Sequence, residues 1–268
     1  MTKQTKNQHN NALTIIIICG NFENTIGDCI KSIKWANEII IVFANSTDNS
    51  KKIAQKLVPQ AKTITTTDQY GKHYAKWRNM GLKLTTNDWI LYIDTDEQVT
   101  PQLKREIQKT ISVRARRASH NYYAIPRANH YLGKRVKHGG SYPDYVKRLF
   151  KKDKLKKWQG TVHEEPIIKG QIGHLKSDLL HFTHSDLSSM LEKTITWTEL
   201  EAKALYKTNH PPVVWWRFFR MMLTTFYTRL IKQQAWKDGT VGWISVIFET
   251  FNTFIIYARL YELQQKIK

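Results

Sequence analysis

Apolar runs alternate with amphipathic segments over the first 111 residues. Three runs rich in β-branched residues, 13–19, 38–43 and 89–93, lack regular polar alternation, which is typical of strands covered on both faces. A weaker strand is expected at 62–66. Between these strands, apolar residues recur three and four positions apart, the spacing of a helix with one buried face. The helices are expected around 26–33, after the turn 46–50 with Ile53 and Leu57 on the buried face, at about 73–84, and from Pro101 with Leu103, Ile107 and Ile111.

This order predicts an α/β fold with a mostly parallel, Rossmann-like sheet and helices on both faces. Such sheets bind ligands where the strands end. The polar residues at the expected strand ends are Gly20-Asn21, Ala44-Asn45 and Asp94-Thr95-Asp96-Glu97. We therefore expect the functional site at this edge.

The rest of the chain has a different pattern. Mixed short strands begin near Tyr122, and after Asp186 the sequence becomes helical. The segment 212–231 is amphipathic, aromatic and arginine-bearing, the composition of helices that lie in a membrane interface. Packing of the same apolar stripe on the rest of the protein or on a second copy is an equal alternative. Polar residues argue against either of the last two helices spanning a bilayer: Arg217, Arg220, Glu249 and Asn252.

Charge narrows the range of partners. The 268 residues include 42 Lys and Arg but 22 Asp and Glu, a net charge of +20, and 41% hydrophobic residues exclude a disordered basic chain. Residues 104–157 contain 17 basic and three acidic residues, so this stretch carries most of the excess. Nucleic acid, an anionic membrane or a phosphorylated substrate would each fit. Cys19 and Cys29 lie in apolar patterns, as expected for reduced core residues.

The acidic turn after the fourth expected strand is the first chemical candidate. Asp94 and Asp96 are two residues apart, so in extended chain both carboxylates point the same way. Hard oxygen ligands at this spacing suit Mg²⁺ or Mn²⁺ bound together with a substrate phosphate. An acidic turn leading to the helix cap at Thr100 is the plain alternative, but the position at a strand end favours a site. Arg78 and Asn79, on the preceding helix, could contact that phosphate.

An ordered series of motifs resembles family 2 glycosyltransferases of the GT-A fold, from about Leu13 to Glu262. Four motifs carry the general resemblance: 15–21, Ser46-Thr-Asp48, Arg78-Asn-Met-Gly81 and 88–97. The later motifs resemble the branch that contains lipopolysaccharide core β-glucosyltransferases: Ile125-Pro-Arg127, Leu132-Gly133, His138-Gly-Gly140, Tyr142-Pro-Asp144, Arg148-Leu-Phe150, Val162-His-Glu164, Leu179-Leu-His181 and Lys237-Asp-Gly239.

The resemblance implies an inverting, metal-dependent transfer of glucose or another hexose from a nucleotide-sugar, a UDP-sugar, to a growing bacterial surface glycan. It implies Glu164 as catalytic base, with Asp144 as second candidate. A Mg²⁺ or Mn²⁺ ion is expected on Asp96, supported by Asp94, with His181 as a further ligand unless it is an ordinary core histidine. The donor-binding residues would be Asn21, Asp48, Arg78, Asn79 and Asp94.

The residue pattern and the resemblance together predict the organisation of the chain. Residues 1–12 are expected to be a disordered tail, and 13–185 a GT-A catalytic domain. Within it, 13–112 would bind the nucleotide-sugar and 113–185 the acceptor, while 186–268 would form a helical, membrane-associating region. The basic stretch would meet a phosphorylated, lipid-linked or lipopolysaccharide-core acceptor. The expected location is cytoplasmic, peripheral on the inner face of the cytoplasmic membrane.

One stretch departs from the family pattern. Where relatives carry an acid that contacts the nucleoside, this chain has Phe43 and Ala44. The donor could be held instead by stacking on an aromatic ring, or through Asp48 or Asp68. The alternative is a catalytically impaired glycosyltransferase-like binding protein. A nucleotidyltransferase would need a glycine-rich phosphate loop, and the sequence after the first strand has none. The charge alone would suggest a nucleic-acid-binding protein, but no nucleic-acid-binding motif supports that hypothesis. We expect no nucleic-acid partner, and a homo-oligomer stays open.

Overall fold

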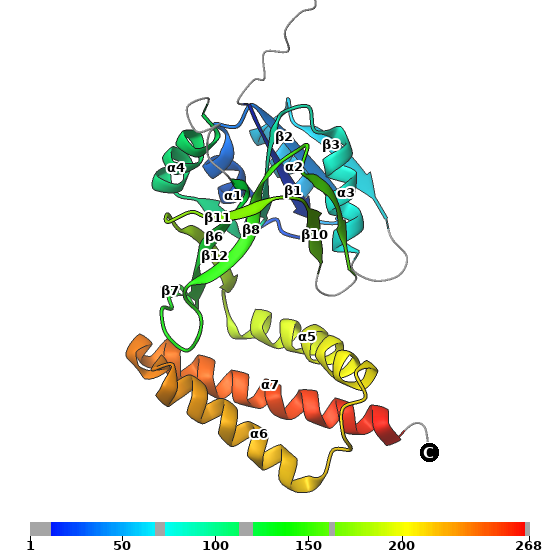
Figure 1. Ribbon diagram of the computed structural model, residues 1–268, viewed down its shortest axis with the longest axis vertical. Coiled ribbons are helices and arrows are strands. Elements are labelled where there is room, and N and C mark those ends of the chain that lie inside the picture. The colour runs from blue at the N-terminus through cyan, green and yellow to red at the C-terminus, as the bar shows by residue number, and fades with distance from the viewer. Residues whose placement is uncertain (1–11, 68–72, 113–119, 161–163, 266–268) are drawn as a thin grey trace, which may run out of the picture. The chain divides into compact units, whose positions relative to one another are not determined.

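The computed structural model describes residues 12–67, 73–112, 120–160 and 164–265 (Figure 1). The strands and helices of these residues follow one another in the order β1 (Leu13–Cys19), α1 (Ile26–Ile33), β2 (Glu38–Ala44), α2 (Ser50–Leu57), β3 (Lys62–Thr66), α3 (Tyr74–Leu84), β4 (Trp89–Asp94), β5 (Glu97–Val99), α4 (Pro101–Ile111), β6 (His120–Tyr131), β7 (Lys134–Arg135), β8 (Asp144–Lys151), β9 (Leu155–Gln159), β10 (Glu165–Ile168), β11 (Gln171–His174), β12 (Leu179–His184), α5 (Leu187–Lys207), α6 (Trp215–Tyr227), η2 (Thr228–Lys232), η3 (Ala235–Asp238) and α7 (Gly239–Gln265). The elements expected in the first 111 residues are confirmed.

The main sheet has a parallel core with antiparallel additions. Its strand order is β3-β2-β1-β4-β8-β6-β12-β5, with β7 and β11 paired to β6. The pairs β3-β2, β2-β1 and β1-β4 are parallel, whereas β8 runs antiparallel to β4 and β12 antiparallel to β5. The predicted Rossmann-like sheet is therefore confirmed, and the later strands extend it on one side.

Each face of the parallel core is covered by its own layer. On one face, α1, α2 and α4 pack through fully buried residues such as Ile30 and Leu103. The other face is covered by α3 and by the β9-β10 hairpin, which contribute Trp77 and Trp158. Alternating residues of β1 divide between the two layers, Ile15 and Ile17 to the first and Ile16 and Ile18 to the second. This alternation explains why β1 is apolar along its whole length.

Helix α3 lies unusually close to the sheet. A Cβ atom at Gly81 would stand 2.6 Å from Cγ2 of Ile16 and 3.5 Å from Cγ2 of Val42. Real Cβ atoms do not approach that closely, so only glycine lets the helix pack at this distance. Arg78 is on the same helix, one turn before Gly81, and the close packing sets where its side chain reaches.

The chain divides into two compact units. Within the described residues, unit 1 comprises 12–127 and 145–181, and unit 2 comprises 128–144 and 182–265. Unit 1 contains the parallel core. Residues 128–144 belong with the C-terminal helices, whereas the sequence analysis assigned them to the acceptor half of the catalytic domain.

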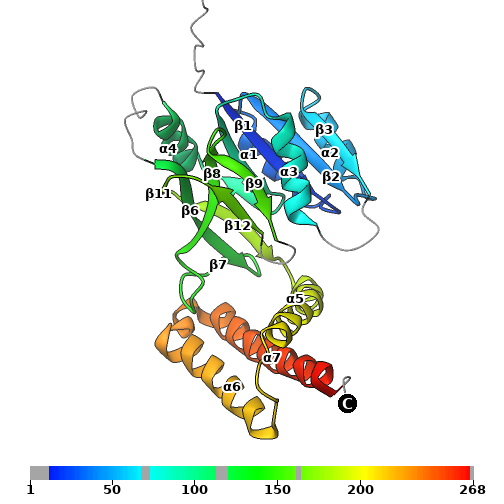
Figure 2. The same ribbon diagram turned by 45° about the vertical axis from the view of Figure 1, so that its right-hand side comes forward.

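Unit 2 is a layer of three helices with a small core. Helix α7 packs against both α5 and α6 (Figure 2). Its two apolar clusters contain few buried residues, among them Leu260 and Leu230. A π-helical turn and a 3₁₀ turn separate α6 from α7, and the motif Lys237-Asp238-Gly239 lies where the second of them ends. Asp238 fastens this turn by accepting hydrogen bonds from the backbone N–H groups of Lys137 (2.9 Å) and His138 (2.8 Å).

Most of the exposed apolar side chains in the described residues belong to unit 2. Of the 20 large hydrophobic residues that are exposed, 17 lie between Leu187 and Tyr261. By length and composition, the segment Ala235–Gln265 could cross a membrane, and only 22% of its most apolar window is buried. The sequence analysis expected no helix with this property, because it gave Glu249 and Asn252 more weight than the surrounding apolar residues.

Candidate functional site

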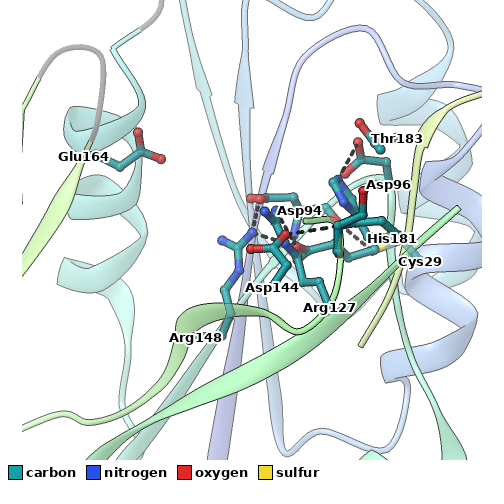
Figure 3. A network of polar contacts seen from close by, with 12 residues as sticks. Cys29, Asp94, Asp96, Arg127, Asp144, Arg148, Glu164, His181 and Thr183 are labelled. Atoms are coloured by element: carbon teal, nitrogen blue, oxygen red, sulfur yellow. Dashed lines mark hydrogen bonds and ion pairs between the residues drawn. The ribbon is translucent and has the colours of Figure 1, made fainter. Parts of the chain in front are cut away.

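The end of β4 holds two carboxylates that share one buried arginine. Asp94 is the last residue of β4, and Glu97 begins β5 after a tight turn. Nη2 of Arg148 contacts a carboxylate oxygen of Asp94 and lies 2.7 Å from Oε1 of Glu97 (Figure 3). Antiparallel pairing of β8 with β4, in which Leu149 lies opposite Leu91, brings Arg148 beside residues 54 positions away.

The two carboxylates respond in opposite ways to this environment. Burial alone would raise the pKa of Asp94, but the positive charges of Arg148 and Arg78 outweigh it and hold that pKa well below its usual range. Burial dominates at Glu97, which has no exposed surface, and with the negative charge of Asp94 it raises the pKa of Glu97 despite Arg148. Glu97 also accepts a hydrogen bond from the backbone N–H of Asp94 at 2.9 Å, which fixes the turn.

Arg78 connects this pair to Glu164. Its Nη2 lies 3.1 Å from Oδ1 of Asp94, and both Nη2 and Nε donate to Oε1 of Glu164, at 3.1 and 3.2 Å. Only 4% of Arg78 is exposed, and its guanidinium stacks over the ring of Trp158 at 4.9 Å. Among the described residues, its buried Nη1 has no hydrogen-bond partner. Nη2 and Nε of Arg78 are thus already in hydrogen bonds, and the buried Nη1 is the donor that an anionic ligand could use.

Asp96 and His181 form the second polar pair of the site. Oδ2 of Asp96 lies 3.5 Å from Nε2 of His181 (Figure 3). The pairing of β12 with β5 sets His181 opposite Glu97, so the late histidine reaches the acidic turn. Among the described residues, no group of three or more His, Cys, Asp or Glu side chains is arranged to hold a metal ion. One carboxylate and one imidazole nevertheless suit a divalent ion whose other ligands are water and a substrate phosphate.

Asn21 and Asp48 tie together the loops that follow β1 and β2. Oδ1 of Asn21 accepts hydrogen bonds from the backbone N–H groups of Thr47 (2.7 Å) and Asp48 (3.3 Å). The carboxylate of Asp48 accepts in turn from the backbone N–H groups of Glu23 and Ser50. These contacts give both residues a positioning role at the expected nucleotide edge. Direct contact with a donor stays a prediction.

Asn79 and Phe43 are both used in packing. Asn79 pairs with the backbone of Trp158 in both directions, at 2.9 and 2.8 Å, which attaches β9 to α3. Phe43 has no exposed surface, so it is not a ring on which a nucleobase could stack. Phe22, with 40% exposure, is an aromatic ring in the loop after β1. Asp68 and Arg114 to Arg117 lie outside the described residues.

Asp144 belongs to unit 2, at the start of β8. One of its carboxylate oxygens accepts a hydrogen bond from Nδ2 of Asn129 at 3.3 Å. Asn129 also donates to the backbone carbonyl of Ser141 at 3.0 Å, and the peptide bond between Tyr142 and Pro143 is cis. Asn129 therefore joins the Asp144 carboxylate to the backbone of Ser141, and the assignment of Asp144 as a second candidate base stays a prediction.

Three residues of the network were not among the predicted site residues: Glu97, Arg127 and Arg148. Arg127 extends the network, with Nη1 3.8 Å from Oε1 of Glu97. Arg148 and Arg127 each stood in a quoted motif, and Glu97 directly follows the Asp-x-Asp pair. An arginine next to the apolar pair Leu149-Phe150 is the one local signal that could have identified Arg148 as buried and therefore paired.

A Rossmann-like sheet with helices on both faces and an acidic turn where β4 ends is the GT-A architecture of nucleotide-sugar-dependent glycosyltransferases. The profile of the family "Glycosyl transferase family 2" matches residues 14–223, which is most of the chain. The chain therefore belongs to glycosyl transferase family 2, and it is a glycosyltransferase.

Several curated relatives match over nearly their whole length, and others over about a third of it. The chain is similar to the lipopolysaccharide core biosynthesis glycosyltransferase LpsC of Rhizobium meliloti (strain 1021), with 23% identity over 93% of this chain and 92% of the relative. Among solved structures, a mycobacterial protein covers 75% of both chains at 12% identity with a TM-score of 0.50. Glucosyl-3-phosphoglycerate synthase of Mycobacterium tuberculosis, solved with Mn²⁺, UDP and phosphoglyceric acid, covers 53% of this chain and 56% of its own at 15% identity, with a TM-score of 0.39.

Proposed function

We propose that this glycosyltransferase moves a hexose from a UDP-sugar to a phosphorylated, lipid-linked acceptor of the lipopolysaccharide core type, with inversion at the anomeric carbon. The observation that carries the proposal is the position of Arg78. It holds Asp94 and Glu164 together and keeps one buried donor, Nη1, without a partner in the described residues. The similarity to LpsC over nearly the full length of both chains supports the class of acceptor.

The chemistry of the transfer assigns a role to each side. Glu164 takes the proton from the attacking acceptor hydroxyl as the new C–O bond forms, and the bond from the anomeric carbon to the diphosphate breaks on the opposite face. UDP leaves with the electron pair of that bond. Arg78 stabilises the departing diphosphate, because an arginine beside a developing anion in a water-poor site is a strong electrostatic partner.

Arg78 also couples the two events. While Arg78 donates to Oε1 of Glu164, that oxygen is less able to take the proton of the acceptor hydroxyl. A bound diphosphate competes for the same guanidinium and releases the Glu164 oxygen to accept a proton. Asp94 and Arg148 keep Arg78 in position, because Asp94 lies between the two arginines.

A divalent ion belongs to this proposal. Asp96 and His181 would hold Mg²⁺ or Mn²⁺, with Asp94 next to them, and the ion would supply Lewis-acid stabilisation of the leaving diphosphate. Arg148 draws the Asp94 carboxylate away from a ligand role, so we assign the primary contact to Asp96.

The acceptor is proposed to meet the basic stretch at the inner face of the cytoplasmic membrane. Part of the charge of this stretch is not available, since Arg148 is buried and paired within the site. Near β9, Lys154 in the preceding turn is half-buried and pairs with Asp153 at 3.1 Å, and Lys156 and Lys157 on the strand itself are exposed. Each such residue near an anionic surface contributes about 1 kcal/mol. Replacing the three with Glu should weaken binding to anionic vesicles, and unchanged binding and transfer would refute this part of the proposal.

The base is tested by a matched pair of neighbours. Glu164→Gln should lower transfer by about 10²–10⁴-fold while UDP binding is kept. Glu165→Gln is the control, because the Glu165 side chain is 63% exposed and pairs with Lys147. If Glu164→Gln transfers normally and Asp144→Asn does not, the second candidate is the base.

The metal assignment needs a separate measurement. Calorimetric titration of the protein with UDP, with and without Mn²⁺, should show that UDP binding depends on the metal. Asp96→Ala should abolish this dependence. The parent should also hydrolyse or transfer at least one UDP-sugar. A parent that binds UDP but turns over no sugar nucleotide would identify a catalytically impaired relative instead.

A further inference from the structure

Helix α6 exposes an apolar stripe that no described residue of unit 2 covers. Its exposed members recur every fourth residue, and the exposed fractions are 75% for Trp215, 63% for Phe219, 67% for Leu223 and 53% for Tyr227. No residue between Trp215 and Tyr227 is buried. In water such a helix would be poorly stable, and a contiguous apolar face of this kind marks an interaction surface.

The stripe continues onto α7. Trp243, Ile247, Phe251 and Phe254 are exposed at helical spacing. Trp243 contacts Phe226 of α6, with ring centroids 6.5 Å apart, and Phe254 contacts Phe218 at 5.7 Å. The exposed residues of both helices form what we call the α6–α7 surface: Trp215, Phe219, Leu223, Tyr227, Trp243, Ile247, Phe251 and Phe254.

The charges around this surface have one sign on the α6 side. From Thr208 to Lys237 the chain has five basic residues and no acidic residue. Four of these basic groups lie over aromatic rings at 5.5–5.8 Å, namely Arg217 and Arg220 over Trp216, Lys232 over Tyr227 and Lys237 over Trp236. Aromatic rings at the acyl boundary with cationic groups among the headgroups are the arrangement of helices that lie in a membrane surface.

Helix α5 provides an internal comparison. It also exposes apolar residues at helical spacing, Leu191 (45%) and Ile195 (61%). Its charges are mixed, because Glu192, Glu199 and Glu201 accompany its lysines. An anionic surface would repel these acids, so α5 lacks the complementarity that α6 has.

We propose that the α6–α7 surface docks on an anionic lipid bilayer, with α6 lying in the plane of the interface and the α6 arginines among the lipid phosphates. This inference rests on the proposed function for its purpose, which is to bring a lipid-linked acceptor to the enzyme. It is separate in its test, because vesicle binding and sugar-nucleotide turnover are measured independently.

The first experiment is co-sedimentation of the full chain with phosphatidylcholine vesicles, with and without phosphatidylglycerol. The parent should bind the anionic vesicles more tightly, and binding should weaken with salt. Phe219→Ser with Leu223→Ser should weaken binding about ten-fold or more. The matched control, Leu191→Ser with Ile195→Ser on α5, should leave it unchanged. Equal effects of the two pairs would overturn the proposal.

The charge contribution is tested on the same helix. Arg217→Gln with Arg220→Gln should weaken binding to anionic vesicles by about five-fold per residue and have little effect on neutral ones. Lys203→Gln on α5 is the control, since Lys203 pairs with Glu199. If both arginine changes act equally on the two lipids, lipid phosphates are not what the arginines recognise, and the proposal fails.

Fluorescent labelling of introduced cysteines then shows which side chains enter the bilayer. Both native cysteines are buried, so a polarity-sensitive fluorophore would react at an introduced Leu223→Cys or Ile195→Cys. The emission should shift to the blue on adding anionic vesicles for the first and not for the second. A second copy of the chain is the competing occupant. A lipid-free dimer at working concentration that the Phe219 and Leu223 changes dissociate would replace the membrane proposal.

Failure of this proposal is distinguishable from failure of the proposed function. UDP-sugar hydrolysis in solution by the Phe219 and Leu223 variant should match that of the parent, because neither residue belongs to unit 1. Vesicle binding without any turnover would support the membrane-docking proposal and refute the transferase chemistry. Turnover without vesicle binding would support the transferase chemistry and refute the membrane-docking proposal.

Discussion

The two units use the same types of side chain for opposite purposes. In unit 1, apolar residues such as Ile17 and Phe150 have no exposed surface, and charged residues such as Glu97 and Arg148 are buried in contact with each other. In unit 2, aromatic residues are exposed and the basic residues sit beside them. Hydrophobicity therefore stabilises the fold in the first unit and creates a surface in the second. The following predictions test this difference, starting with the largest effect.

Removing Arg148 should have the greatest consequence. Arg148→Met leaves Asp94 and Glu97 as two neighbouring carboxylates without their shared cation, which costs about 5 kcal/mol in the free energy of unfolding. Transfer activity should be lost as well. Urea unfolding measures the change, and Lys156→Met on β9 is the control, expected within about 0.5 kcal/mol. If the two substitutions cost the same, the buried network does not support unit 1.

Two phenylalanines give the direct comparison of packing. Phe150→Ala removes a fully buried ring that contacts Tyr92 and Trp158, and should cost about 3–4 kcal/mol. Phe219→Ala removes a ring with 63% exposure and should cost less than about 1 kcal/mol. Unfolding followed by circular dichroism gives both values. A large cost at Phe219 would mean that α6 is part of a core and not a free surface.

Glu38 should make unit 1 sensitive to acid. Burial would raise its pKa, but hydrogen bonds from Lys62, Thr14 and Thr86 outweigh burial and lower the pKa from 4.5 to about 2. A depressed folded-state pKa contributes stability above pH 4.5 that is lost as the pH falls towards 2. Discounted for partial exposure, the loss is about 2 kcal/mol.

Glu38→Gln should therefore be less stable at neutral pH and lose less stability on acidification. Denaturant unfolding at several pH values measures both. Glu199→Gln on α5 is the control from unit 2, since the Glu199 side chain is 49% exposed. An unchanged acid response in Glu38→Gln would show that other carboxylates are responsible.

The smallest expected effect on stability tests whether the two units unfold independently. The side chain of Thr100 caps α4 by accepting from the backbone N–H of Leu103 at 3.1 Å, and Asp186 forms a capping box with Ser189 at the start of α5. Thr100→Ala and Asp186→Ala should each cost about 1 kcal/mol. Because the units have separate cores, the Asp186 change should lower only the transition of unit 2, followed by a fluorophore on that unit. Thr100→Ser should restore the cap. A single transition that both alanine variants lower equally would mean that the units unfold together.

The sequence predicted the parallel core well because its pattern is local. The continuous apolar strands and the helices with one buried face could be assigned from neighbouring residues, and the Thr100-Pro101 start of α4 is confirmed. Asp94 and Asp96 were likewise found from their spacing and their place after a strand. Each of these features depends on residues within a few positions of one another.

The shared arginine could not be predicted in this way. Arg148 reaches Asp94 because β8 adds to the sheet antiparallel to β4, and no local pattern gives that pairing. Glu164 meets Arg78 across 86 positions of the chain for a similar reason. In unit 2, the sequence analysis placed Phe219, Leu223 and Leu230 in one amphipathic segment, 212–231. The structure separates them, because Leu230 is buried and the other two are exposed.

The absent side chain at Gly81 has a consequence for redesign of the proposed donor site. A Cβ atom at this position would overlap Cγ2 of Ile16, and Arg78 extends from the same helix to Asp94 and Glu164. Adding a methyl group at Gly81 would push the helix outward and lengthen both arginine contacts together. Position 81 is thus a spacer that sets the reach of the guanidinium. A redesign of α3 should therefore keep glycine at position 81.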